Sequence, residues 1–237
     1  MKKTTNLTAT ALAVAVATGA SFTVPQSAQA EVSATLGASN MYLWRGQNIS
    51  NPSPQVSGSL DYSHESGFYA GVWGSSEGPF DGSSETDLYA GYGTKFGEFG
   101  IDLSYWKYLY PGRQVGGVEC DLGDCDLSDV VLGLSYGPVA LTGYFGVESG
   151  STKDKYYTLS GTMSSFTLLY GLYQSGETAD GMDYSHLQLS YAFNDAVTFT
   201  VSKASDDGYG LGASSPSTVF TENPLFQVSY SHTFDMK

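Results

Sequence analysis

Along residues 31–237, apolar and polar residues alternate in about a dozen segments of roughly ten residues each. Alternation with a period of two places apolar side chains on one face of a β-strand and polar side chains on the other. In the last segment, for example, Phe226, Val228 and Tyr230 alternate with Gln227 and Ser229. The pattern predicts antiparallel strands that each have one apolar and one polar face.

Twelve strands are expected, an even number. Their approximate ranges are 32–46, 55–64, 67–75, 86–95, 99–110, 128–136, 139–147, 155–163, 166–172, 186–193, 197–202 and 226–234. Ten strands would also fit, because strand ends are marked less clearly in a sequence than strand centres. No segment shows strong helix signals, and the 18 Tyr and 29 Gly suit twisted strands and aromatic belts.

The connections between the expected strands alternate regularly between short and long. Hydrophobic alternation alone would also fit a soluble barrel with an apolar interior. Alternating connection length is typical of transmembrane barrels, in which short turns lie on the periplasmic side and long loops face outward. We therefore predict an all-β fold, a transmembrane antiparallel up-and-down β-barrel with both ends of the chain on the periplasmic side.

The first thirty residues have the features of a cleaved signal peptide. Met1-Lys2-Lys3 gives a basic start, residues 11–17 are apolar, and Ala28-Gln29-Ala30 is a good cleavage site. A membrane anchor is the alternative, but the apolar run is short and rich in Thr. Residues 31–237 would then form one exported barrel in the bacterial outer membrane, in contact with lipid and lipopolysaccharide. The aromatic Phe234 near the end resembles the signal that barrel-assembly machinery reads, although Asp235-Met236-Lys237 follow it.

The charge of the exported part is strongly negative. All 24 acidic residues but only eight of the ten Lys and Arg residues lie after residue 30, which gives a net charge of −16. Nucleic acid is therefore excluded as an expected partner. The acidic residues would either keep exposed loops soluble or form an acidic pore mouth.

One long connection contains both cysteines of the chain, Cys120 and Cys125. In an exported protein, an even pair in one loop favours a disulfide. Acidic residues crowd the same loop and the last one, at Glu119, Asp121, Asp124, Asp126, Asp206 and Asp207. Their spacing does not match an EF-hand, so solvated charge is expected rather than calcium binding. We predict no metal site and no cofactor.

Two runs of residues resemble a known family. The runs are SNMYLWRG at 39–46 and DYSHESGFYAGVW at 61–73. They are similar to the TorF-type porin family of exported proteobacterial proteins, densely over 36–75 and at pattern level beyond. The resemblance implies an outer-membrane barrel and says little about the solute.

Several charged residues are candidates for lining a pore. Strand parity places Arg45 opposite Tyr42 and Trp44, so Arg45 would point into the lumen if the aromatic residues face lipid. The same counting gives five acidic candidates, Asp61, Asp87, Asp102, Asp129 and Glu148. Rings of charge of this kind set ion selectivity in pores. The alternative is an ion pair that braces the barrel wall.

These observations predict a passive porin for small hydrophilic solutes that prefers cations. A closed structural or adhesive barrel that displays acidic loops is the alternative. A barrel hydrolase is a third interpretation, but the three histidines, His64, His186 and His232, lie in a turn, on an inward face and on an outward face, without an evident nucleophile. The protein is therefore predicted not to be an enzyme.

Overall fold

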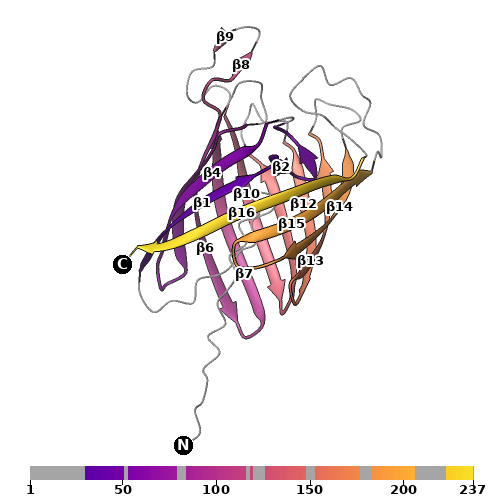
Figure 1. Cartoon of the computed structure of the whole chain (residues 1–237). Helices are drawn as coiled ribbons and strands as arrows, with labels where there is room; N and C mark the ends of the chain where they lie inside the picture. The colour runs from indigo at the N-terminus through magenta and orange to yellow at the C-terminus, as the bar shows by residue number, and fades with distance from the viewer. Residues whose placement is uncertain are drawn as a thin grey trace, which may run out of the picture.

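The protein is a closed barrel of twelve antiparallel strands, which confirms the predicted fold class and strand number (Figure 1). The computed structural model describes residues 30–50, 53–78, 84–115, 118–119, 126–147, 153–176, 183–205 and 223–236. The barrel strands are β1 (Glu31–Ser39), β4 (Gln55–Ser63), β5 (Phe68–Ser75), β6 (Glu85–Phe96), β7 (Phe99–Leu109), β10 (Leu127–Tyr136), β11 (Val139–Gly146), β12 (Lys155–Met163), β13 (Phe166–Gln174), β14 (Tyr184–Ala192), β15 (Val197–Ser205) and β16 (Leu225–Met236).

Each barrel strand pairs with its neighbours in the chain, and the last strand closes the barrel on the first. β1 pairs with β16 in the register Ala34↔Phe234. The pair Val32↔Met236 places the start of β1 and the end of β16 at the same end of the barrel. Tight turns lie at that end, and Gly67, Gly97 and Gly137 adopt positive φ there. The strand ends that the longer connections join, such as Ser75 of β5 and Glu85 of β6, lie at the other end (Figure 1).

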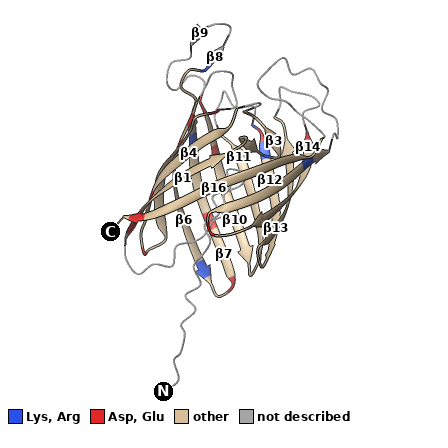
Figure 2. Cartoon of the chain, viewed as in Figure 1, with Lys and Arg blue, Asp and Glu red and all other residues tan. Residues whose placement is uncertain are grey.

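The outward face of the barrel is apolar and exposed, and the inward face is polar. Leu36, Val56 and Leu159 project outward, with exposed fractions between 52% and 62%. Their inward neighbours in the chain are small and polar, such as Thr35, Ser57 and Thr158. Figure 2 shows that the wall itself carries few charged residues. A soluble barrel would have the reverse arrangement, so the exposed apolar face belongs to a membrane-spanning barrel.

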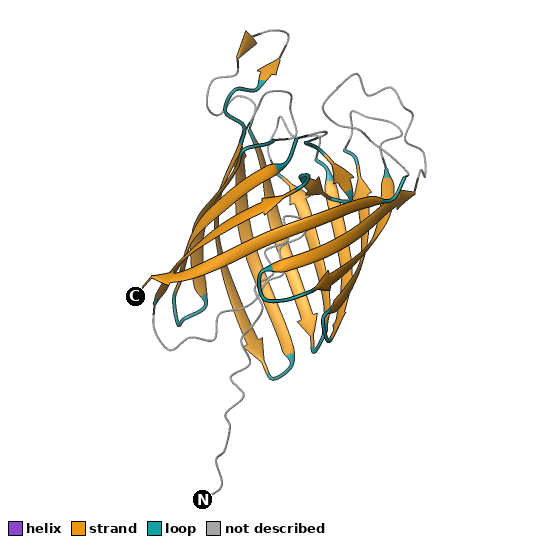
Figure 3. Cartoon of the chain, viewed as in Figure 1, coloured by secondary structure: helices purple, strands orange, loops and turns teal. Residues whose placement is uncertain are grey.

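The predicted first strand was wrong beyond Ser39. β1 ends there, and residues 40–50 turn into the lumen and form a small hairpin from β2 (Leu43–Trp44) and β3 (Gln47–Asn48) (Figure 3). A second small hairpin, β8 (Gln114–Val115) with β9 (Val118–Glu119), lies beyond the long-loop end of the barrel. Within the described residues, no helix is long and apolar enough to cross a bilayer.

Candidate lumenal constriction

The β2–β3 hairpin is built around a two-residue turn, Arg45-Gly46. Both residues adopt positive φ, 46° and 84°, as a type I′ turn requires. The strands pair as Leu43↔Asn48 and Trp44↔Gln47, and the Ile49 amide donates to the Tyr42 carbonyl over 2.9 Å. The sequence therefore encodes a tight hairpin with a cationic side chain at its tip.

The hairpin is buried inside the barrel and held to it by polar contacts. Leu43 is fully buried, and Tyr42 and Ile49 are 3% exposed. At its base, the Gln227 side chain donates to the Met41 carbonyl over 3.0 Å. The backbone amide of Val228 donates to Asn40 Oδ1 over 2.8 Å. These contacts fix the segment across the lumen.

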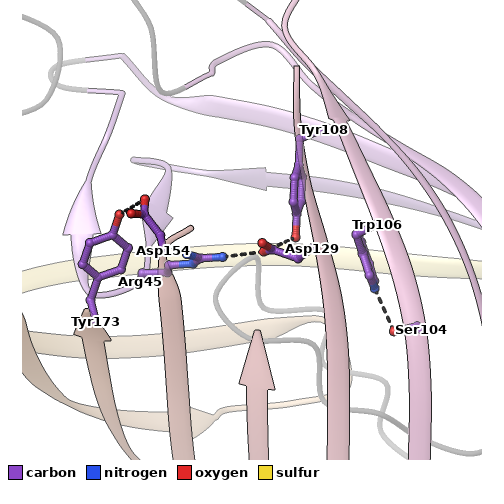
Figure 4. Close-up of polar contacts among 7 residues, drawn as sticks. All are labelled: Arg45, Ser104, Trp106, Tyr108, Asp129, Asp154 and Tyr173. Carbon is purple, nitrogen blue, oxygen red and sulfur yellow. Dashed lines mark hydrogen bonds and ion pairs between the residues drawn. The ribbon is translucent and has the colours of Figure 1, made fainter. Parts of the chain in front are cut away.

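Arg45 crosses to the opposite side of the lumen and meets Asp129 of β10. The guanidinium Nη2 lies 2.9 Å from Asp129 Oδ2, and the Tyr108 hydroxyl donates to the same oxygen over 3.0 Å (Figure 4). Burial alone would lower the pKa of Arg45, but the Asp129 carboxylate and nearby tyrosines raise it above its ordinary value. Arg45 is therefore a permanently charged group in the constriction.

Aromatic rings surround the Arg45 guanidinium. Its carbon lies 4.4 Å from the ring centroid of Trp44, 4.9 Å from that of Tyr156 and 5.4 Å from that of Tyr144. Tyr173 lies 5.9 Å away and donates its hydroxyl to Asp154 (Figure 4). Carboxylate and rings together form a cage that suits a planar cation.

Gly46 is required for the close packing of the hairpin tip. A Cβ atom at this position would lie 2.4 Å from Cγ of His186. On the same wall, the Tyr184 hydroxyl donates to the Arg45 carbonyl over 2.9 Å. The His186 ring in turn shares a 2.7 Å hydrogen bond with the Tyr156 hydroxyl. The tip therefore rests directly on the side chains of β12 and β14.

The other side of the hairpin contacts an acidic part of the wall. The Tyr42 hydroxyl donates to Glu85 of β6 over 2.6 Å, and the Tyr42 ring lies 6.0 Å from that of Trp73. Burial raises the pKa of Tyr42, and the carboxylates of Glu85 and Asp87 raise it further. Tyr42 therefore stays neutral and serves as the hydrogen-bond donor of this pair.

The structure places four of the predicted acidic candidates on the lumen side. Asp61, Asp87, Asp102 and Asp129 face inward from β4, β6, β7 and β10. Arg45 also lies in the lumen, although a hairpin and not strand parity brings it there. The parity argument was wrong for Tyr42, which is buried in the lumen instead of facing lipid. Glu148, Cys120 and Cys125 lie outside the described residues, so the role of Glu148 and the disulfide stay predictions.

The sequence interpretation missed Glu85 and the tyrosine–carboxylate pairs. Glu85 shares the inward parity of Asp87, but the expected strand began one residue after it. The pairing of Tyr89 with Asp61 and of Tyr69 with Asp102 joins residues on different strands. These pairs can be identified only when the register between the strands is known, and the sequence does not determine that register.

The histidines lie as their positions in the pattern suggested. His64 belongs to the turn between β4 and β5, and His232 faces outward from β16. His186 faces inward, and its ring shares a hydrogen bond with the hydroxyl of Tyr156 and not with that of a serine. Among the described residues, no group of three or more His, Cys, Asp or Glu side chains could hold a metal ion.

Comparisons with known proteins identify a sequence family and several barrels of similar shape. A family model described as "Bacterial protein of unknown function (Gcw_chp)" matches residues 24–167. No protein of curated function matches the sequence. The TorF-type resemblance over 36–75 stays a prediction.

Three solved barrels illustrate the structural similarity. The KdgM porin is 11% identical, with a TM-score of 0.47 over 87% of this chain and 99% of that one. KdgM in complex with disordered oligogalacturonate is 12% identical, with a TM-score of 0.45 over 87% and 98%. Outer membrane phospholipase A from Escherichia coli is 11% identical, with a TM-score of 0.42 over 88% and 92%. Barrels of different function thus have similar scores.

Proposed function

The chain belongs to the Gcw_chp family of bacterial proteins of unknown function, and we propose that it is an outer-membrane porin for small hydrophilic solutes. The observation that carries this proposal is a polar lumen, narrowed by an inward-folded hairpin, inside a barrel with an apolar exterior. In porins, a polar interior inside an apolar exterior is a water-filled channel. The signal peptide at 1–30, the outer-membrane location, and contacts with lipopolysaccharide and the assembly machinery belong to the same proposal.

The charges of the lumen support a preference for cations. Arg45 is neutralised by Asp129, with which it forms an ion pair. Asp61, Asp87 and Asp102 form no ion pair with Lys or Arg within the described ranges. The remaining field is therefore negative, and a negative field raises the local concentration of cations.

Planar-bilayer recordings test the proposal. We expect single channels whose reversal potential in a KCl gradient shows cation selectivity. Replacement of residues 41–49 by a short Gly-Ser linker should raise the conductance severalfold, because the hairpin no longer fills the lumen. The outward substitution Tyr105→Leu is the control and should leave the conductance unchanged. Anion selectivity, or no conductance from either protein, would overturn the proposal.

A closed barrel is the second candidate, and the burial of the hairpin favours it. Leu43 at 0% and His186 at 2% exposed leave little space around the hairpin tip. A closed structural or adhesive barrel would give no current as the native protein, whereas the variant without the hairpin would conduct. The same pair of recordings therefore separates the two candidates.

We also propose that the protein is not an enzyme. His186 could serve a hydrolase only with a nucleophile beside it, and the hydroxyl that it meets belongs to Tyr156. Lipid hydrolysis that is lost on His186→Gln while the barrel stays folded would contradict this.

A further inference from the structure

We propose that the lumen side of β4–β7 binds organic cations that carry a guanidinium or ammonium group. This surface, the acidic aromatic wall, consists of Asp61, Asp87, Tyr89, Asp102, Trp106 and Tyr108. The proposal deepens the proposed porin function, on which it rests for the route by which a ligand enters. It names a solute class that the porin proposal leaves open.

Strand register brings three residues of the wall, Asp61, Tyr89 and Trp106, into one continuous row. Asp61 pairs with Gly71, Gly71 with Tyr89, Tyr89 with Trp106, and Trp106 with Asp129. Asp61, Tyr89 and Trp106 alternate with outward residues such as Leu60, Leu88 and Tyr105, and Asp129 meets Arg45 in the lumen, so the row faces the lumen. The row therefore has a carboxylate at each end and two aromatic rings between them.

The rings of the row overlap and are fixed in place. Tyr89 and Trp106 stack with centroids 4.2 Å apart and an angle of 16°, and Tyr108 lies 6.4 Å from Trp106 at 23°. The Trp106 ring nitrogen donates to Ser104 Oγ over 3.1 Å (Figure 4). Tyr89 donates its hydroxyl to Asp61. The wall is thus a preorganised aromatic surface and not a set of mobile side chains.

Glycine gives Tyr89 the space to lie flat on the barrel wall. A Cβ atom at Gly71 would lie 2.5 Å from the Tyr89 hydroxyl oxygen. The absence of a side chain there lets the ring cross β5 and reach Asp61 on β4. Tyr69 crosses β6 over Gly91 in the same way and donates to Asp102 over 2.9 Å. The same arrangement occurs twice, and each time it presents a ring beside a carboxylate.

The wall contains an acceptor that lacks a donor. Asp87 is 6% exposed, and its Oδ1 atom has no hydrogen-bond partner among the described residues. It faces the lumen between Trp73 and Tyr108, its register partners on β5 and β7. A buried carboxylate oxygen without a donor is costly, and an N–H group of a cationic ligand would satisfy it.

The environment of Arg45 indicates which kind of cation binds between carboxylates and aromatic rings in this barrel. The Arg45 guanidinium occupies a cage of one carboxylate, Asp129, and the rings of Trp44, Tyr144 and Tyr156. The acidic aromatic wall offers the same two components, carboxylates and rings, and no Arg or Lys of the described residues forms an ion pair with Asp61, Asp87 or Asp102. A cation brings both the N–H donor that Asp87 Oδ1 lacks and a charge that suits the ring faces, whereas a neutral sugar or an anion does not bring both.

Calorimetric titration of the full mature chain in detergent micelles tests the inference. The probe is agmatine, which carries a guanidinium and an ammonium group, and glucose and galacturonate are the neutral and anionic comparisons. We expect agmatine to bind, and Asp87→Asn and Trp106→Leu each to weaken its binding about tenfold. The matched controls are Asp195→Asn, in an exposed turn, and Tyr105→Leu, on the outward face next to Trp106. Both should bind agmatine as the native protein does.

The outcomes separate this inference from the porin proposal. Agmatine binding without any channel current would overturn the porin proposal and support the binding site. Cation-selective current without agmatine binding would overturn the binding site alone. Glucose binding as tight as that of agmatine, or equal loss of binding in the control variants, would also overturn it. Circular dichroism verifies that each variant keeps its β-structure.

Discussion

The aromatic side chains on the two sides of the lumen differ in their exposure. On β12–β15, which we name the packed wall, Tyr156, His186 and Thr200 are at most 2% exposed. On the acidic aromatic wall of β4–β7, the rings of Tyr89, Trp106 and Tyr108 are half-buried, although Asp87 and Asp102 are only 6% and 4% exposed. The tip of the β2–β3 hairpin rests on the first side, where Gly46 meets His186.

The two walls share one structural arrangement, although only the acidic aromatic wall carries carboxylates. On each wall a tyrosine lies near a glycine and bonds to a polar side chain: Tyr156 with His186 beside Gly171, and Tyr89 with Asp61 over Gly71. The hairpin tip covers the packed wall, whereas on the other side the hairpin contacts Glu85 and Trp73 and leaves the Tyr89 and Trp106 rings half-buried. The comparison teaches that one inward loop can cover the two sides of a barrel lumen to different extents.

The largest effect should come from the ion pair that holds the hairpin tip. Arg45→Met keeps an apolar stem but leaves Asp129 as an unpaired buried carboxylate, so we expect a loss of about 3–5 kcal/mol in the free energy of unfolding. Urea unfolding in lipid vesicles measures it. The double variant Arg45→Met/Asp129→Asn should lose less than the sum of the two single variants.

The Lys107–Asp126 pair is the control for this experiment. Its atoms lie 3.6 Å apart, and the Lys107 side chain is 23% exposed. The Asp126 side chain is 6% exposed, so Lys107→Met also leaves a buried carboxylate, but it should cost less than Arg45→Met because this pair is longer and the Lys107 end is partly exposed. Additive effects of the Arg45 and Asp129 substitutions would show that the pair does not hold the hairpin.

The fold was predictable from the sequence because hydrophobic alternation and connection length are local signals. Alternation in segments such as 226–234 fixed which residues face outward, and the even strand number followed from counting. The hairpin was not predictable in the same way, since SNMYLWRG continues the alternation of β1 past Ser39. The Arg45-Gly46 pair was the one signal of a turn, and Arg is not a usual residue at positive φ.

The candidate site was predictable only in part. Parity placed Asp61, Asp87, Asp102 and Asp129 in the lumen, because parity depends on neighbours in the chain. The pairing of each tyrosine with a carboxylate depends on the strand register and on the stagger of the barrel. The sequence of a single strand does not determine either of them. The packed wall and the acidic aromatic wall were therefore indistinguishable before the structure.

The second largest effect should come from Gly46 at the contact between the hairpin and the packed wall. Gly46→Ala adds a Cβ atom 2.4 Å from His186 at a residue with φ of 84°. Backbone strain and the clash together should cost about 2–4 kcal/mol. Gly97→Ala separates the two causes, because Gly97 has φ of 64° but no atom within 4 Å of the added Cβ. It should cost about 1–2 kcal/mol, and equal losses would argue against a close contact at the tip.

A smaller difference in the free energy of unfolding is expected between alanine substitutions at two glycines in extended strands. Gly171→Ala on the packed wall would place a Cβ atom 2.1 Å from Nε2 of His186, whose ring is covered and has no room to move. We expect a loss of about 1–3 kcal/mol. Gly71→Ala displaces the end of Tyr89, which is half-buried beside the lumen and can move off the added Cβ atom by giving up its hydrogen bond to Asp61, so the loss should be about 0.5–1.5 kcal/mol. Thermal unfolding of both variants measures this, and a reversed order would contradict the distinction between the walls.

The smallest effect should be the loss of one hydroxyl from the acidic aromatic wall. Tyr89→Phe removes the hydrogen bond to Asp61, but water in the lumen can solvate that half-buried carboxylate, so unfolding should become easier by about 0.5–1 kcal/mol. Tyr156→Phe on the packed wall leaves the buried His186 ring without the partner of its Nε2 atom and should cost about 1–3 kcal/mol. Urea unfolding of the two variants under the same conditions compares them directly. If Tyr89→Phe proved as costly as Tyr156→Phe, Asp61 would be closed to water, and the wall could not be the accessible half of the lumen.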